Sequence, residues 1–247
     1  MLASFNTHIF WVALSSRPFW RGALLALELT FVSFAISIVL GFFLALGRGS
    51  RSRTVRGGVF FYTWIFRATP TLLQLLFVWD ALPEIWPVFR SGWFTPFLAA
   101  AITLSLNEAA YMAEIVRSGL LSVDPGQELA GRALGMSRRR ILRRIVVPQA
   151  VRIVIPPMGN EFITLLKLTS LASVISVTEL LTAAQNFYST TFSYQEAFAA
   201  AALYYLVIVS VLMVLQSRLE KRFTFTSRGR KRRVVAPAVP AISHDAR

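Results

Sequence analysis

The chain alternates long apolar stretches with short polar ones, and five of the apolar stretches predict membrane-spanning helices. They lie at about residues 20–46, 59–81, 96–116, 149–168 and 197–216. A bilayer core of about 30 Å requires roughly 20 apolar residues in a helix, which each stretch approaches or exceeds. The pattern therefore predicts an all-α, polytopic membrane protein.

Two of these spans contain helix-breaking residues. In the second span, Thr69 and Pro70 have the order of a helix cap followed by a first-turn proline. The fourth span contains Pro156 and Pro157. A membrane helix tolerates proline where neighbouring helices or water bond the freed carbonyl groups. We therefore expect irregular helices with polar partners beside these prolines.

The two ends of the chain differ from the spans. Residues 1–19 contain a short apolar run without a basic start, which predicts an interfacial segment rather than a cleavable signal peptide. Residues 223–247 are basic and then rich in proline and alanine, which predicts a disordered tail. Between them, residues 20–222 are expected to form the membrane domain.

The arginines predict the orientation of the spans. The segments 48–56, 117–152 and 217–247 are strongly basic, and basic segments near spans remain in the cytoplasm. All three are cytoplasmic if five spans run from an outside N-terminus to an inside C-terminus. A sixth crossing at residues 169–189 would place these basic segments on different sides of the membrane. We therefore predict that 169–189 dips into the outer side without crossing, with six spans as the alternative.

Composition excludes several classes of function. The net charge of +14 alone is compatible with nucleic-acid binding, but the charge flanks apolar spans in a chain with 55% hydrophobic residues and a mean hydropathy of +0.57. The chain has no cysteine and two histidines near its ends, so no thiolate metal site is expected. It contains neither a P-loop nor a catalytic triad pattern. We therefore expect no enzyme activity, no bound cofactor or metal and no nucleic-acid partner.

The segment between the third and fourth spans is polar and rich in arginine, and its pattern predicts two short helices. Asp124 is placed to cap the first helix, with Pro125 at its first position. Gly135 is a natural left-handed stop. Ser137 then caps a second helix, which we expect to end at Pro148 because proline lacks the N–H that continues a helix.

Two features of this segment are unfavourable for a simple connector. Gly131 lies within a short helix, at a cost of roughly 1 kcal/mol relative to alanine. Residues 138–140 are three arginines at a helix N-terminus, where the helix dipole disfavours cations. Two interpretations remain open: a solvated basic loop beside the membrane, or a docking element whose small residues let a partner approach closely.

The same segment resembles the cytoplasmic coupling loop of ATP-binding cassette (ABC) importer permeases. That motif reads Glu-Ala-Ala, three residues, Gly, nine residues, Ile, one residue, Leu-Pro. Here Gly135 is followed by nine residues and then by Ile145, Val146, Val147 and Pro148. The Glu-Ala-Ala part of the motif aligns with Leu129, Ala130 and Gly131. The glutamate of this chain, Glu128, lies one position before the motif glutamate. The flanking sequences, GQELAGRALG and the stretch from VPQAV to LTAAQ, resemble the polar amino acid branch of these permeases.

The resemblance implies a type I importer-like permease domain at residues 20–222, with a coupling loop at 117–148. Its implied partners are a cytoplasmic ABC ATPase dimer that uses ATP, a second permease copy or a sister permease, and an extracytoplasmic binding protein that delivers a polar amino acid or a derivative. The implied location is the bacterial inner membrane. The residues implied in ATPase coupling are Glu128, Ala130, Gly131, Ala133, Gly135 and Pro148.

Polar residues inside the spans are candidates for the substrate pathway, because they are costly in a membrane and therefore usually functional. The GNEFI stretch around Glu161 matches the permease family, in which this region lies near the cavity; Leu168 replaces an aspartate of the family pattern. The alternative is that Glu161 and Lys167 form interhelical pairs that hold the bundle. The candidates are Glu28, Asn107, Glu108, Asn160, Glu161, Lys167, Thr169 and Ser170.

A transporter driven by an ion gradient is the alternative function. It would also carry acidic residues inside its spans, but it more often shows repeated halves, and none is visible in this sequence. Three further ionisable residues are interpreted structurally. Arg67 is interpreted as a cytoplasmic anchor or a snorkelling residue, and Glu114 with Arg117 as a pair within one helix.

Overall fold

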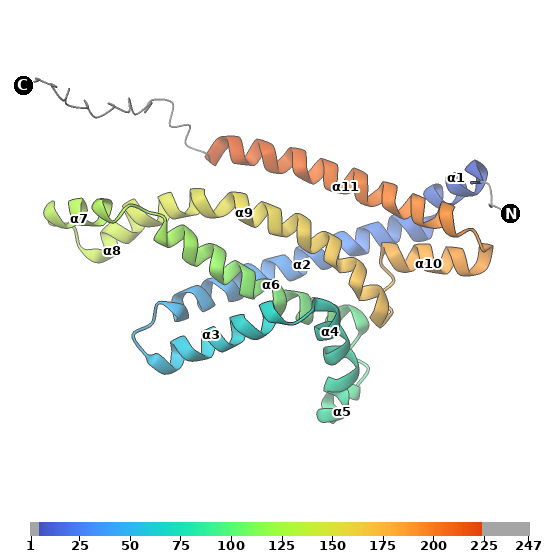
Figure 1. Ribbon diagram of the computed structural model, residues 1–247, viewed down its shortest axis with the longest axis horizontal. Coiled ribbons are helices and arrows are strands. Elements are labelled where there is room, and N and C mark those ends of the chain that lie inside the picture. Colours follow the sequence, from blue (N-terminus) through green and yellow to red (C-terminus); the bar gives the residue numbers. More distant parts are fainter. Residues whose placement is uncertain (1–4, 224–247) are drawn as a thin grey trace, which may run out of the picture.

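The computed structural model describes residues 5–223, and within this range the chain forms helices and turns with no strand. Figure 1 shows an elongated bundle in which several long helices run side by side. The α-helices are α1 (Thr7–Ser15), α2 (Arg17–Arg48), α3 (Arg53–Ala68), α4 (Thr71–Leu76), α5 (Leu82–Ile85), α6 (Pro96–Leu121), α7 (Pro125–Ala133), α8 (Arg138–Ile141), α9 (Val147–Leu168), α10 (Leu180–Thr191) and α11 (Tyr194–Phe223). The all-α prediction is thereby confirmed.

The central contact of the bundle joins α2 and α6, and small residues line it. A Cβ atom added at Gly41 would lie 2.4 Å from Cβ of Met112, so only glycine fits this crossing. Ser33 and Ser37 are also fully buried on α2. Small residues let membrane helices approach closely, where packing rather than the hydrophobic effect holds them together.

A second packed region lies at the end of the bundle where α1, α10 and α11 meet the start of α2 (Figure 1). Phe19 and Leu180 are fully buried there. The hydroxyl of Tyr204 donates to the carbonyl of Leu14 (2.7 Å), which ties α11 to α1. The predicted interfacial segment thus contains α1 and the first turn of α2. The predicted tail, except for Phe223, lies outside the described residues.

Two of the described helices, α2 and α11, are individually long and apolar enough to cross a membrane. A bent pair, residues 138–175 together with Leu180–Thr191, gives a third candidate with a bend of 47°. α6 has 26 residues, or about 39 Å, which is sufficient in length. The five-span topology and the orientation of the termini stay predictions.

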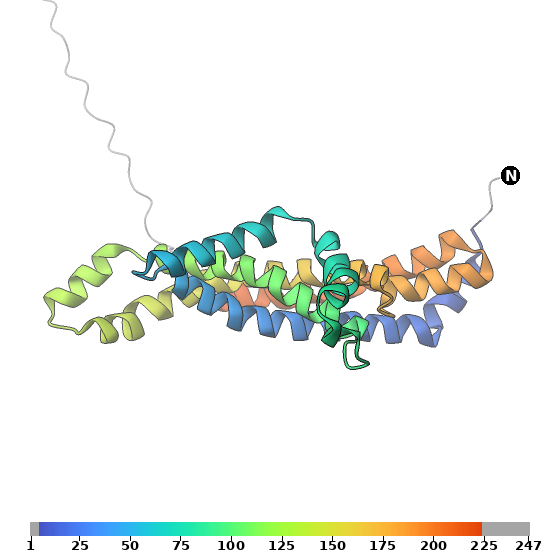
Figure 2. The ribbon, with the colours of Figure 1, turned by 90° about the horizontal axis from the view of Figure 1, so that it is seen from below.

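The interruption expected in the second span is present. α3 ends at Ala68, Thr69 and Pro70 are extended, and α4 begins at Thr71. Figure 2 shows α3 running along the bundle, and Figure 1 shows α4 turning away from it. Pro70 precedes the first helical residue instead of occupying it, because its extended backbone (ψ 133°) makes it the cap.

The expected helix end at Pro148 is wrong. α8, the π-helix η3 (Leu142–Val146) and α9 form one uninterrupted helical segment from Arg138 to Leu168. The π-turn lengthens the hydrogen-bonded ring immediately before the proline, and such turns accommodate a residue that an α-helix would exclude. The fourth predicted span therefore begins inside a longer helix instead of at a new start.

Residues 169–189 are helical but broken. The 3-10 helix η4 (Thr169–Ile175) ends at Ser176, which adopts a left-handed conformation with φ 63°, and α10 follows. α10 has 12 residues, or about 18 Å, which is less than a bilayer core of about 30 Å. The length of α10 is compatible with the predicted dip of residues 169–189 into the outer side, which stays a prediction.

Candidate functional site

The break between α3 and α4 is held by a network of side-chain amides. Pro70 has no N–H, so the carbonyl of Phe66 four residues earlier loses its helical donor. Asn107 of α6 donates to that carbonyl (3.0 Å), and so does Gln74 of α4 (3.1 Å). Asn107 also donates to Oε1 of Gln74 (2.9 Å), while Gln74 donates to the hydroxyl of Thr69 (2.7 Å). Asn107 therefore fixes the position of the break.

Two carboxylates lie next to this network. Glu108 follows Asn107 halfway along α6 and is only 1% exposed, and within residues 5–223 its Oε1 has no hydrogen-bond partner. Glu161 of α9 is half-buried, close enough to Glu108 and to Arg67 for their charges to interact. An unpartnered carboxylate oxygen inside a membrane protein is expensive, and such groups usually serve function.

Arg67 lies at the edge of a cavity of about 330 Å³ between α3 and α6. Its guanidinium group stacks over the ring of Tyr111 at 5.5 Å. At the other end of the cavity, Arg48 contacts Glu114 (3.7 Å), and Arg117 lies 3.9 Å from the same carboxylate. The expected pair of Glu114 and Arg117 is thus confirmed, with Arg48 as an additional partner.

This arrangement has a definite chemical capacity. Glu108 and Glu161 are acceptors for a cation, Arg67 is a donor for a carboxylate, and Tyr111 provides an aromatic wall. Among the described residues there is no group of three His, Cys, Asp or Glu side chains that could hold a metal ion. The region from Arg67 to Glu161, here called the polar cluster, thus contains groups of both signs of charge.

The other predicted pathway residues lie elsewhere. Asn160 points towards α11, where its side chain accepts a hydrogen bond from Gln216 (2.8 Å). Glu28 and Lys167 are exposed on α2 and α9, and neither forms an ion pair in the part of the chain that the structure describes. The alternative prediction is that Glu161 and Lys167 form ion pairs between helices. Within residues 5–223 neither residue forms an ion pair.

The hydroxyl groups of Thr169 and Ser170 bond to their own helix. Thr169 donates to the carbonyl of Leu166 (2.7 Å) and is fully buried, and Ser170 donates to the carbonyl of Lys167 (2.7 Å). Hydroxyls bonded in this way to a carbonyl of the preceding turn are less available to a ligand. Of the eight predicted pathway residues, the structure thus brings together Asn107, Glu108 and Glu161.

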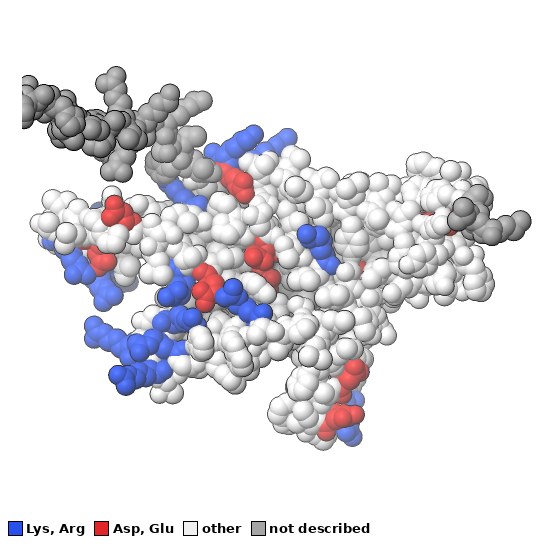
Figure 3. Space-filling view, in the orientation of Figure 1, with Lys and Arg blue, Asp and Glu red and all other residues white. Residues whose placement is uncertain are grey.

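The predicted coupling segment projects from one end of the bundle as α7 and α8 (Figure 1). Asp124 caps α7 by accepting from the N–H of Gly126 (2.7 Å), and Gly135 adopts φ 73°, both as expected. Ser137 occupies the cap of α8 without a side-chain bond. Figure 3 shows lysines and arginines gathered over this end of the molecule.

The two sides of α7 differ. Gly131 is buried against Ile141, where an added Cβ would lie 2.9 Å from the side chain, so its small size serves packing within this chain. Ala130 and Ala133 are exposed, and Glu128 pairs with Arg132 along the helix. Leu129 and Leu134 are 70% and 82% exposed. α7 therefore presents small and apolar side chains outward, while Pro148 lies further along the following helix.

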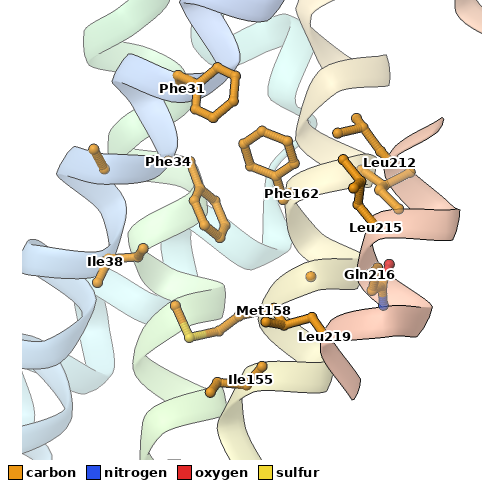
Figure 4. A pocket seen from close by; sticks show the side chains of 13 residues that line it. Phe31, Phe34, Ile38, Ile155, Met158, Phe162, Leu212, Leu215, Gln216 and Leu219 are labelled. Carbon is orange, nitrogen blue, oxygen red and sulfur yellow. The ribbon is translucent and has the colours of Figure 1, made fainter. Parts of the chain in front are cut away.

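A large apolar groove of about 650 Å³ lies between α2, α9 and α11 (Figure 4). Phe34, Phe162 and Leu215 line it, with the amide of Gln216 as a polar group at its side. Gln216 donates to the carbonyl of Pro156 (3.4 Å), whereas the carbonyl groups that Pro156 and Pro157 leave without a helical donor are those of residues 152 and 153. Its wall has few polar groups, so the groove is less suited than the polar cluster to a polar substrate.

The sequence pattern does not identify Arg67 as part of the polar cluster, nor Gln74 as part of the amide network that holds the break between α3 and α4. Arg67, predicted to be an anchor or a snorkelling residue, is exposed, and its charge also acts on Glu161. Gln74 is not singled out by the apolar pattern, although the proline at position 70 signals that the carbonyl of Phe66 needs a donor. The proline in the sequence thus identifies the carbonyl group that lacks a donor. It does not identify the side chain that donates to it, because that depends on how α4 and α6 pack.

Comparison with known sequences identifies the family. Residues 37–225 match the family described as "Binding-protein-dependent transport system inner membrane component". The chain is 41% identical over 231 residues to the arginine transport system permease protein of Corynebacterium glutamicum, covering 90% of this chain and 72% of that one. It is 41% identical over 204 residues to the octopine transport system permease protein of Rhizobium radiobacter, covering 81% and 83%.

Comparison with solved structures agrees. The fold matches a chain from the crystal structure of an amino acid ABC transporter with histidines, with a TM-score of 0.80 and 33% identity, covering 90% of this chain and all of that one. The helical bundle, the family match and these relatives all point in one direction. The chain belongs to the family of binding-protein-dependent transport system inner membrane components.

Proposed function

We propose that this chain is the permease subunit of an ATP-driven importer for a polar amino acid or an amino acid derivative. The relatives named above are permeases for arginine and octopine, and the matching structure is an amino acid ABC transporter. The observation that carries the proposal is α7, a capped helix at the basic end of the bundle with exposed Leu129, Ala133 and Leu134. Such a projecting apolar surface fits a protein partner.

The proposal assigns three partners. An ABC ATPase dimer docks on α7 in the cytoplasm, a second permease copy or a sister permease completes the pathway, and an extracytoplasmic binding protein delivers the substrate. The basic end that includes α7 then faces the cytoplasm of a bacterial cell, as the positive-inside rule expects. Exposed Glu28 and Lys167 face the second permease or the pathway.

The polar cluster is the proposed substrate site. Glu108 and Glu161 bind the cationic group of the substrate, and Arg67 binds its carboxylate. This division follows from charge: a zwitterion presents both signs, and the cluster presents both in the same place. Asn107 acts as a positioning residue, because it holds the break that sets the place of Arg67.

A crosslinking experiment tests the coupling. Cysteine is introduced by Ala133→Cys in this cysteine-free chain, and the permease is co-expressed with candidate ATPase subunits. We expect a crosslink whose yield changes with ATP. Gly58→Cys is the control, because Gly58 lies on α3 with open space around it. No ATP-dependent adduct from Ala133→Cys in a folded complex overturns the docking assignment.

Transport in proteoliposomes tests the function and the site. Uptake that vanadate inhibits supports an ATPase, whereas uptake that only an uncoupler inhibits supports the gradient-driven alternative. Glu161→Gln is expected to reduce uptake at least tenfold while the ATPase still binds. Glu84→Gln, at an exposed carboxylate of α5, is expected to leave uptake unchanged. Equal uptake by both variants excludes Glu161 from the site.

A further inference from the structure

A cavity of about 310 Å³ lies where the first turns of α2 meet the start of α10. Its polar lining consists of Arg17 and Arg21 from α2, Thr178 from the loop before α10, and Asn186 from α10 itself. Figure 1 shows α10 at the end of the bundle opposite to α7 and α8. The cavity is therefore at the other end of the molecule from the coupling segment, and it shares no residue with the polar cluster.

The two arginines of this cavity have no partner of opposite charge within residues 5–223. Neither Arg17 nor Arg21 forms an ion pair or a side-chain hydrogen bond with another described residue. Two carboxylates at this end are buried and already engaged, because Glu179 caps α10 and Glu196 accepts from the N–H of Asn6 (2.7 Å). The positive charge of the cavity is thus not neutralised by the described chain.

The placement of these arginines is unfavourable as long as no anion is bound. Arg17 and Arg21 lie four residues apart on one face of α2, where like charges repel each other. Arg17 is also the first residue of α2, at the end where the helix dipole disfavours cations. Glu28, the first acidic residue of α2, lies seven residues beyond Arg21, or about 10 Å along the helix. An anion in the cavity would relieve both costs.

The two elements that form the cavity are in close contact. A Cβ atom added at Gly22, next to Arg21, would lie 2.9 Å from backbone atoms of Glu179 and Leu180, so glycine permits this approach. Phe19 and Leu180 are fully buried in the same region. The arginines are therefore carried by a packed helix end, which fixes the place of the cavity before a ligand arrives.

The polar groups of the cavity suit a carboxylate. Guanidinium groups present planar donors that match the two oxygens of a carboxylate. The side chains of Thr178 and Asn186 make no hydrogen bond with another described residue, so a hydroxyl and an amide remain as further donors. The apolar lining consists of Pro18 and Ala183, which together are too short to hold the acyl chain of a lipid.

We propose that this cavity receives an acidic side chain of the extracytoplasmic binding protein, held by Arg17 and Arg21. The inference rests on the proposed function, in which α7 faces the cytoplasm and the end with this cavity faces the outside. Both arginines are exposed and therefore accessible from that side. Arginine is normally enriched on the cytoplasmic side, so an unpaired pair at the outer end requires another reason. Complementary charges speed the encounter of two proteins and fix their orientation.

ATP hydrolysis by the permease–ATPase complex in phosphatidylcholine nanodiscs tests the docking. The binding protein used is the one whose addition stimulates hydrolysis by the wild-type complex, and its concentration for half-maximal stimulation is measured. Arg17→Gln with Arg21→Gln is expected to raise this concentration at least fivefold. The matched control, Arg53→Gln with Arg56→Gln at two exposed arginines of α3, is expected to leave it within twofold of the wild type.

A second pair of variants adds a charge instead of removing one, at exposed positions where folding is little affected. Asn186→Asp places a carboxylate in the cavity, where it competes with the partner's acidic side chain, and should raise the half-maximal concentration at least threefold. Gln185→Glu makes the same change of charge one residue away, outside the lining, and should leave it within twofold.

The outcomes separate the possible occupants. An unchanged concentration in both cavity variants, or an equal increase in their controls, overturns the docking site. An increase that appears only when the nanodiscs contain phosphatidylglycerol assigns the cavity to a lipid phosphate and overturns the proposal as well. If no binding protein stimulates the wild-type complex, the proposed function fails, and this inference fails with it.

Discussion

The α2–α6 contact and the α9–α11 contact both join long apolar helices, but they pack in opposite ways. At the first, glycine and small residues bring the helices so close that a Cβ at Gly41 would overlap Met112. At the second, a groove of about 650 Å³ remains between the helices. The contrast shows that close approach of two helices here depends on small residues at their contact, and that the side of α11 retains an open apolar groove.

The largest expected difference comes from Gly41→Leu. Its side chain would have to displace Met112 and the backbone of Ala113, so the loss of stability should be about 3 kcal/mol or more. Gly58→Leu is the control, because Gly58 has open space on α3 and leucine has better helix propensity. Thermal unfolding of the detergent-purified proteins measures both. Equal midpoints would remove the distinction between the two regions.

Leucine truncations give the next largest effect. Leu104 is fully buried in the core, and Leu104→Ala should cost about 2 kcal/mol, the low end for such changes because lipid is as apolar as the protein interior. Leu215 lines the groove and is 53% exposed, so Leu215→Ala should cost under about 0.5 kcal/mol. The same unfolding experiment compares them, and a larger loss at Leu215 would mean that the groove is filled in the isolated protein.

Asparagine substitutions test the polar contacts of the two regions. Asn107→Ala removes donors to Phe66 and Gln74, and hydrogen bonds between membrane helices are worth about 0.6–1.7 kcal/mol. Asn160→Ala removes one exposed contact with Gln216 and should cost less than half as much. A double variant with Gln74→Ala measures the coupling. If Asn107→Ala and Gln74→Ala are additive, the network does not act as a unit.

The smallest effect is expected for Gly159→Ala at the open contact. The added methyl group would lie 2.9 Å from Cγ of Gln216, a flexible side chain that can move into the groove. Alanine also favours the helix by up to about 1 kcal/mol, so the net change should stay within about 0.5 kcal/mol. A large decrease in the unfolding midpoint would show that α9 and α11 pack as tightly as α2 and α6.

Local features of the fold were predictable because neighbouring residues determine them. The cap at Asp124, the left-handed Gly135 and the break at Thr69 each follow from a few adjacent residues. The predicted helix end at Pro148 is wrong because the helix continues past this proline, with a π-turn at residues 142–146 just before it. Nothing in the apolar pattern signals this turn.

The candidate site was predictable only in part. Intramembrane charge pointed to Glu108 and Glu161, and the structure places them near each other. The same rule also selected Glu28 and Lys167, which lie elsewhere on exposed surfaces. Burial cost identifies unusual residues but not their neighbours, so the participation of Arg67 depended on how α3, α6 and α9 pack.

The uninterrupted helix from Arg138 to Leu168 has a mechanical consequence. At 1.5 Å per residue it is a rod of about 46 Å, with the coupling segment at one end and Glu161 near the other. Under the proposed function, a displacement of α7 would pass through the short connection at residues 134–137 into this single helix, which also carries Glu161. Pro156 and Pro157 remove two backbone hydrogen bonds within this helix, so they are where its stiffness would be lowest under such a load.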